Sequence, residues 1–290
     1  MDDFILNDRY FDPEASRLSS HFSQIFILPG PASFQYAILD TEKNMFVGLA
    51  DYRLPKNTEN SWQYTARLNR IFSSDPFLQK KYPAVIFGIN SPYHILVPAE
   101  LYDAGKATSL LELHFRLPEN IIAATDRLEE VGAYHVFGNE DVIQGFIRDK
   151  AADSLIVHRS TALIKAVNLL HRQLNDPVSV YLNLNENQLD IVFFRNGKLE
   201  FFNSFPYREK EDILYFTLYT LEQLDLRPDG IKLILSGGLL GETDTEALLR
   251  QYIRTVTFTG PMPGFGFHNI FKPAPLYRYF QLFALALCGS

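Results

Sequence analysis

The stretch that decides the fold is Val178–Phe205, VSVYLNLNENQLDIVFFRNGKLEFFNSF. Short runs of aliphatic and aromatic residues alternate in it with turn-forming residues, including the Asn196-Gly197 dipeptide that favours a tight hairpin. The pattern predicts an antiparallel meander of three strands. These strands are expected at 178–182, 189–194 and 199–205, with a polar turn at 183–187, a helix over 209–224 and a buried strand at 231–235.

The same order of elements occurs earlier, in Gln24–Tyr52, QIFILPGPASFQYAILDTEKNMFVGLADY. Here the predicted strands are 24–28, 34–39 and 45–52, followed by a helix with Ser61 as its N-cap and a strand at 84–89. The two copies align without a gap when Phe26 is placed on Val180 and Ile38 on Val192. A duplicated unit of this kind predicts two α/β lobes that face each other across a cleft.

Further α/β elements lie between the two copies. Strands are predicted at 93–97, 121–124, 133–137 and 155–158, and Asn139 and Ser160 are predicted to cap two helices. The division between the lobes is placed near residues 149–160, and the helix capped by Ser160 is the candidate connection. The first lobe is therefore expected to span residues 1–155 and the second 156–290.

Composition narrows the classes of function. A net charge of -7 and the lack of a basic cluster disfavour binding to nucleic acid. The single cysteine, Cys288, cannot form an intramolecular disulfide, which fits a reducing cytoplasm. The longest apolar stretch, Phe280–Cys288, is about half of what a bilayer requires, so a buried helix is expected there and no membrane span.

Three segments together resemble a known superfamily. They are the duplicated meander, the junction Leu233-Ile234-Leu235-Ser236-Gly237-Gly238, and the leucine-rich segment Leu276–Leu287. The chain resembles the superfamily of actin, sugar kinases and heat-shock-70 proteins, with a duplicated ribonuclease H-like fold. It looks most like an uncharacterised bacterial family assigned to the actin-like ATPase fold, and its last helix is similar to that of pilus-assembly and cell-division members.

This resemblance implies a position for a nucleotide. In the superfamily the Gly-Gly junction packs against adenosine, which assigns Ser236, Gly237 and Gly238 to binding ATP or ADP. The turns of the two meanders would hold the phosphates, which adds Gly30 in the first turn and Asn183 and Asn185 in the second.

The chain departs from the superfamily at the acidic positions. Active members carry an Asp-x-Gly motif in each meander turn, where the aspartates organise magnesium and the attacking water. The first turn here, Leu28–Ser33, has no carboxylate and has two prolines that cannot donate an amide proton. In the second turn, asparagines stand where aspartate and glycine are expected. No catalytic residue is therefore predicted, and the hydrolysis mechanism of the superfamily lacks its anionic groups.

Other candidate groups carry structural interpretations. The seven histidines show no spacing typical of a metal site, so no metal ligand is predicted, and His171 is expected at the surface of a helix. Asp190 is expected to point from its strand toward solvent, and neither it nor Glu186 is assigned a catalytic role. Trp62 is assigned to the core, and the Gly- and Pro-rich segment 257–271 to a connector anchored by aromatic residues.

Two hypotheses of function remain open. The first is a catalytically inactive actin-fold protein, a pseudo-ATPase, that acts as a scaffold or binds a protein partner. The alternative is a nucleotide-binding protein, either a divergent ATPase or a small-molecule kinase, that uses the cleft between the lobes. The fold alone does not decide between the two.

Overall fold

The computed structural model describes residues 4–15, 22–55, 60–174, 176–238, 240 and 244–289. Its residues cluster into two compact units. The first contains Met1–Ala162, Gly264–Ala274 and Leu285–Ser290, and the second contains Leu163–Pro263 and Pro275–Ala284. The division at 155/156 stays a prediction; in this clustering, the chain first changes unit inside helix α4 (Arg159–Leu174).

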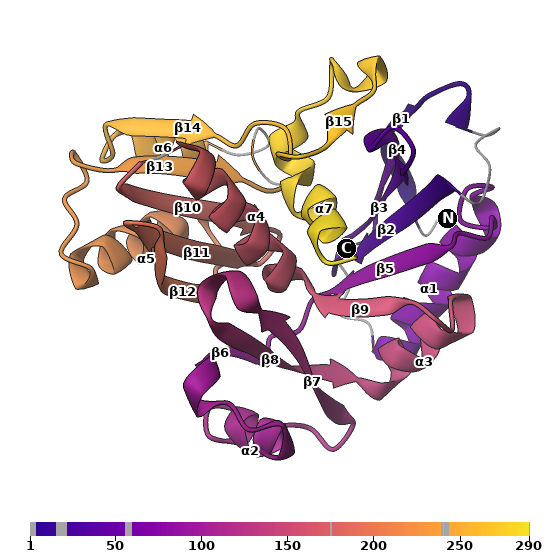
Figure 1. The fold of residues 1–290 in the computed structure, drawn as a ribbon, viewed down its shortest axis with the longest axis horizontal. Coiled ribbons are helices and arrows are strands. Elements are labelled where there is room, and N and C mark those ends of the chain that lie inside the picture. Colours follow the sequence, from indigo (N-terminus) through magenta and orange to yellow (C-terminus); the bar gives the residue numbers. More distant parts are fainter. Residues whose placement is uncertain are drawn as a thin grey trace. The chain divides into compact units, whose positions relative to one another are not determined.

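The first unit is built on a sheet with strand order β1-β4-β3-β2-β5-β9, in which β15 also pairs with β4 (Figure 1). Its strands are β1 (Ile5–Phe11), β2 (Ser23–Pro29), β3 (Ser33–Asp40), β4 (Met45–Arg53), β5 (Ala84–Ile89), β9 (Leu155–His158) and β15 (Gly266–Phe267). Helices α1 (Ser61–Ser74) and α3 (Asp141–Lys150) pack against this sheet, with the rings of Phe72 and Phe146 5.6 Å apart.

A small second sheet, of order β6-β8-β7, also belongs to the first unit. It consists of β6 (His94–Pro98), β7 (Ile121–Leu128) and β8 (Ala133–Glu140), and helix α2 (Ala107–Glu112) contributes Leu111 to its core. Short 3-10 helices accompany it at Ala99–Leu101, Ala104–Lys106 and Glu129–Val131.

The second unit repeats the meander and the parallel strand of the first. Its sheet has the order β12-β11-β10-β13-β14, and β10 pairs antiparallel with β11 and parallel with β13, as β2 does with β3 and β5. The elements are β10 (Val178–Asn185), β11 (Gln188–Arg195), β12 (Lys198–Pro206), α5 (Lys210–Gln223), β13 (Lys232–Ser236), α6 (Thr245–Arg250) and β14 (Thr255–Phe258). The predicted duplication is therefore confirmed in strand order and in strand direction.

The C-terminal region is helical and buried, but it is not one regular helix. It runs through 3-10 turns at Asn269–Phe271 and Leu276–Tyr279, helix α7 (Phe280–Ala284) and a last 3-10 turn at Leu285–Leu287. The side chains from Tyr279 to Ala286 are buried, so the expected burial is confirmed.

The Gly- and Pro-rich segment 257–271 is a connector anchored by aromatic residues, as predicted. Phe265 and Phe267 place their rings 5.5 and 5.2 Å from that of Phe46 in β4. Asn44 fixes the same place by donating a hydrogen bond to the carbonyl oxygen of Gly264, which has a φ of 86°. The chain passes from the second unit to the first at Gly264.

Several local predictions were wrong by a few residues. Helix α1 is capped by Asn60 rather than Ser61, because Asn60 and Gln63 exchange the two hydrogen bonds of a capping box. Asn139 lies in β8 and the N-cap of α3 is Glu140, while Ser160 lies inside the first turn of α4.

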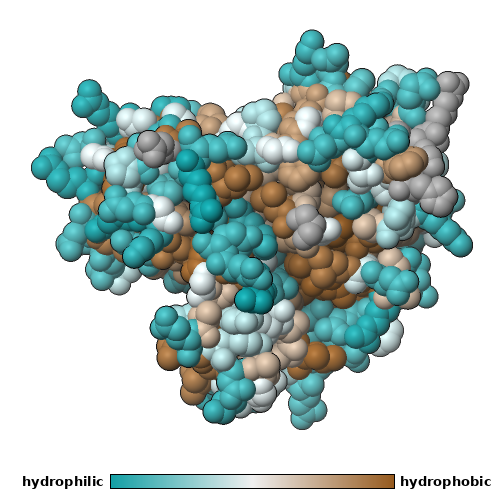
Figure 2. All heavy atoms as spheres, viewed as in Figure 1, coloured by the Kyte–Doolittle hydropathy of each residue, from teal (hydrophilic) through white to brown (hydrophobic). Residues whose placement is uncertain are grey.

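Two predictions about burial were also wrong. Trp62 is 72% exposed because it lies near the N-terminus of α1, on the face turned away from the core residues Leu68 and Ile71. Hydrophobic residues reach the surface elsewhere as well, for example near β9 on the face shown in Figure 2. Conversely, His171 of α4 is only 3% exposed, because it stacks on Phe194 and accepts a hydrogen bond from the amide of Gly197.

Burial lowers the pKa of His171 below its ordinary value, although nearby Asp176 acts in the opposite direction. The unfolded chain then binds more protons than the folded one in the range just below pH 6.5, so stability falls as the pH falls through that range. We expect His171→Phe, which keeps the ring stack, to lose less stability than the wild type between pH 7.5 and 5.5. Urea denaturation at both pH values measures this, and equal losses would contradict it.

Candidate functional site

The residues of the predicted phosphate turn of the second unit lie at the ends of adjacent strands whose central residues are buried. Asn183 of β10 is paired in register with Asp190 of β11 on one side and with Ser236 of β13 on the other. All three side chains are at most 3% exposed. Strand β10 continues to Asn185, so the prediction that 183–187 is a turn was wrong: only Glu186 and Asn187 form it.

Asp190 is the centre of a closed hydrogen-bond network at this turn. Its Oδ2 accepts hydrogen bonds from the side-chain amides of Asn183 at 3.2 Å and Asn185 at 3.5 Å. Its Oδ1 accepts from Gln188 at 3.2 Å and from the hydroxyl of Ser204 at 2.6 Å. The prediction that Asp190 points to solvent was wrong, because β11 is an interior strand buried on both faces and alternation does not separate an outer face there.

Ser236 extends the same network. Its hydroxyl donates a hydrogen bond of 3.0 Å to Oδ1 of Asn183, the oxygen that would otherwise be available to a cation. The structure therefore brings two of the predicted site residues, Asn183 and Asn185, into contact with one buried carboxylate, and Ser236 joins them through Asn183. Their polar atoms are directed at one another.

Gly237 and Gly238 differ in what surrounds them. Gly237 has a φ of 114°, and a Cβ added to it would lie 2.1 Å from the carbonyl oxygen of Leu184. Its amide donates to the carbonyl of Tyr277. Among the residues that the structure describes, none has an atom within 4 Å of a Cβ added to Gly238, and the carbonyl of Gly238 accepts a hydrogen bond from Arg278. The backbone around Gly237 thus leaves no room for a side chain, whereas a Cβ at Gly238 would meet none of the described residues.

Gly30 occupies the corresponding turn of the first unit. Its amide donates to the carbonyl of Ser33 at 2.8 Å, and its own carbonyl accepts from the hydroxyl of Tyr64 at 2.9 Å. The turn is therefore closed by its own backbone. Because Pro29 and Pro31 on either side have no N–H, the group of amides that would surround a phosphate is reduced further.

These partners do not fit a magnesium-bound phosphate group at either turn. Magnesium needs several oxygen ligands in octahedral geometry, and the oxygens of Asn183 and Asp190 accept hydrogen bonds within the chain. Contact of an adenosine with Gly238 stays a prediction.

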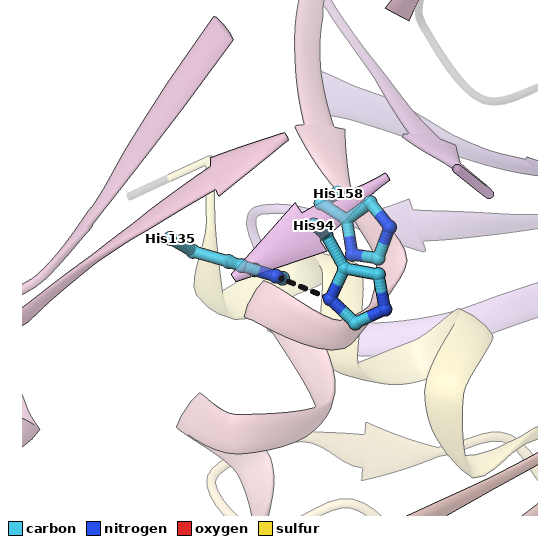
Figure 3. A group of neighbouring side chains, drawn as sticks. All are labelled: His94, His135 and His158. Atoms are coloured by element: carbon cyan, nitrogen blue, oxygen red, sulfur yellow. Dashed lines mark hydrogen bonds between the residues drawn. The ribbon is translucent and has the colours of Figure 1, made fainter. Parts of the chain in front are cut away.

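A second group of polar residues escaped the sequence analysis. His94, His135 and His158 come together in the first unit, each with a ring nitrogen within 4.8 Å of the corresponding nitrogens of the other two (Figure 3). They are far apart in the chain: the register of β6 and β8 joins His94 and His135, and His158 comes from β9 of the other sheet. The one sequence signal was the position of each histidine in or beside a predicted apolar strand.

Burial governs the charge of this cluster. His135 and His158 have no exposed surface, and burial, together with the neighbouring His94, lowers the pKa of both rings well below the ordinary value. Both rings are therefore neutral at pH 7.

Comparisons with known proteins agree with this architecture. Residues 12–256 match the model of a family described as protein of unknown function, DUF3822. A crystal structure from Bacteroides thetaiotaomicron, described as a protein with actin-like ATPase fold and unknown function, is 21% identical with a TM-score of 0.78, over 93% of this chain and 97% of that one. The chain therefore has the actin-like ATPase fold.

A more distant similarity is to a structure described as the PilM-PilN type IV pilus biogenesis complex. It is 13% identical with a TM-score of 0.65, over 92% of this chain and 98% of that one. No curated protein gave a significant match in sequence. Of the helices that the structure describes, none is long and apolar enough to cross a membrane.

The two adjacent glycines of the junction provide a matched test of the site's geometry. We expect Gly237→Ala to destabilise the protein by about 2–3 kcal/mol, because its Cβ would overlap the backbone of Leu184 and its φ is positive. Gly238→Ala should change stability by less than about 0.5 kcal/mol. Denaturant unfolding measures both losses of stability. Similar losses for the two variants would show that the backbone at Gly237 is not packed against Leu184.

Proposed function

Because the chain belongs to the DUF3822 family and has the actin-like ATPase fold, we propose that it is a pseudo-ATPase that acts by binding a protein partner. The main support for this proposal is the hydrogen-bond network around Asp190, in which the polar side chains near the second phosphate turn are hydrogen-bonded to one another. A hydrolase of this fold needs those positions for magnesium and the attacking water.

Binding to a partner is supported by two further observations. A protein of the same fold occurs in a complex named for PilM and PilN, so the fold is compatible with a role in assembly. Helix α5 of the second unit also presents two exposed tyrosines, Tyr215 and Tyr219, whose rings stack with centroids 5.9 Å apart. Exposed aromatic residues are frequent at the centres of protein interfaces. The single cysteine is compatible with a reducing environment, and we propose the cytoplasm as the location of this activity.

A nucleotide screen tests the loss of ATPase function. We expect millimolar ATP or ADP with magnesium to leave the melting temperature unchanged within about 1 °C, because a ligand that does not bind the folded state cannot stabilise it. ATP turnover should equal that of protein-free buffer. Calorimetric scans and a phosphate-release assay measure the two quantities.

Two arginine substitutions control the screen. Gly238→Arg and Gly260→Arg both enter open space, but only the first lies at the predicted adenosine position. A nucleotide-dependent rise in melting temperature that disappears in Gly238→Arg and persists in Gly260→Arg would overturn the pseudo-ATPase proposal and support the alternative of a nucleotide-binding protein.

The tyrosine pair tests the partner-binding part. We expect Tyr215→Ser combined with Tyr219→Ser to reduce capture of the partner about tenfold or more, since truncating interface aromatics typically costs that much affinity. Tyr252→Ser, which removes a tyrosine that is 53% exposed outside this pair, should retain capture. Quantitative mass spectrometry of cross-linked complexes provides the measurement. Equal capture by all three proteins would exclude α5 as the contact surface.

A further inference from the structure

The histidine cluster is positioned by rigid elements. His94 begins β6, His135 lies within β8, and His158 ends β9 (Figure 3). In the small sheet, His94 is opposite Phe137 and His135 is opposite Leu96, so the two histidines are diagonal neighbours on one face. Asp126 of β7 is directly opposite His135 on that same face.

The hydrogen bonds around His135 fix its protonation. Thr161 donates its hydroxyl proton to Oδ2 of Asp126 at 2.6 Å, so the Thr161 oxygen, 2.8 Å from Nδ1 of His135, must accept from that nitrogen. The proton of His135 is thus assigned to Nδ1, and Nε2 carries a lone pair. That lone pair faces Nδ1 of His94 at 3.0 Å.

His158 is held in place by the backbone. The amide of Ser160 donates to its Nδ1 at 3.2 Å, and its Nε2 lies 3.1 Å from the carbonyl oxygen and 3.3 Å from the amide of Ser91, so both ring nitrogens have backbone partners. Its own amide donates to the same Oδ2 of Asp126 that accepts from Thr161. One carboxylate therefore fixes the ring of His135 through Thr161 and the backbone of His158 directly.

This arrangement has the parts of a metal centre in proteins. Histidine ligands characteristically use one ring nitrogen for the metal and donate from the other to a carboxylate, a carbonyl or an intermediary, which fixes the ring and its tautomer. His135 donates through Thr161 to Asp126 and keeps Nε2 directed at the cluster.

We propose that His94, His135 and His158 bind one divalent transition-metal ion of the zinc class. Neutral imidazole is a preferred ligand of these ions, and three of them leave a fourth position for water. Metal–nitrogen bonds of 2.0–2.1 Å place tetrahedral ligand atoms about 3.3 Å apart. The nitrogens of His94 and His135 already lie 3.0 Å apart, and the cluster as a whole lies within 4.8 Å.

Binding requires a small rearrangement. The nitrogen of His158 that binds the metal must give up its hydrogen bond with the backbone and approach by on the order of 1 Å, and the proton of His94 must move from Nδ1 to Nε2 so that Nδ1 can bind the metal. Neither change requires a break in the strands that hold the rings.

Titration of the full-length chain with Co²⁺ and Zn²⁺, after removal of metals by a chelator, tests the proposal. We expect one equivalent of Co²⁺ to produce the visible absorption of a tetrahedral centre, and Zn²⁺ to displace it with a dissociation constant of about 1 µM or tighter. X-ray absorption of the zinc form should count three imidazole ligands.

Three variants locate the metal. His94→Gln, in a half-buried ring, should lower the affinity by about 100-fold or more, and Asp126→Asn by about 10- to 100-fold. His114→Gln removes an exposed histidine of the same unit and should leave the affinity unchanged. If His94→Gln fails to fold, as judged by circular dichroism, the ligand count in the wild type decides.

Either of two results would overturn the proposal. One is a folded wild-type protein that takes up neither ion at micromolar concentration. The other is evidence that the metal lies elsewhere, which would come from binding that His94→Gln leaves unchanged or from a ligand count without three imidazoles.

Discussion

Strands β10 and β11 are buried on both faces, and this burial constrains every polar side chain that they carry. A polar group without a partner in such a place costs on the order of 1–3 kcal/mol, which favours partners within the sheet for the polar side chains near the turn. Asn183 and Asp190 have such partners in each other, in Ser204 and in Ser236. In a protein that handles phosphate, the same positions would be satisfied by a metal and its water. Here the fold is retained and the partners are internal.

The elements with strong local signals could be predicted from sequence. The strand at 84–89 agrees with β5, and the hairpin at Asn196-Gly197 has the positive φ angles that its dipeptide favours. The duplication was visible because apolar runs, turns and helices recur in the same order. Strands β1, β14 and β15 were not predicted. β15 has only two residues, and its register with Met45 and Phe46 comes from a part of the chain that is remote in sequence.

The candidate sites were less predictable because their geometry depends on contacts over long sequence distances. Alternation along one strand placed Asp190 at the surface, and only the presence of neighbours on both sides buries it. His94 and His135 meet because of the register of β6 and β8, which no spacing rule contains. His171 illustrates the same limit: a polar residue on a helix was assigned to the surface, while its ring packs on Phe194. Residue type predicted the chemistry available at these positions, but not which groups would meet.

The path of the chain between the units has a consequence for handling the protein. It passes from one unit to the other near residues 162, 263, 274 and 284, so neither unit is a single continuous segment. A truncation at the predicted boundary would deprive the first unit of β15, which pairs with β4, and of Leu285, which lies against Gly88. To isolate either half by recombinant expression, the C-terminal pieces would have to be grafted back through new linkers or a circular permutation.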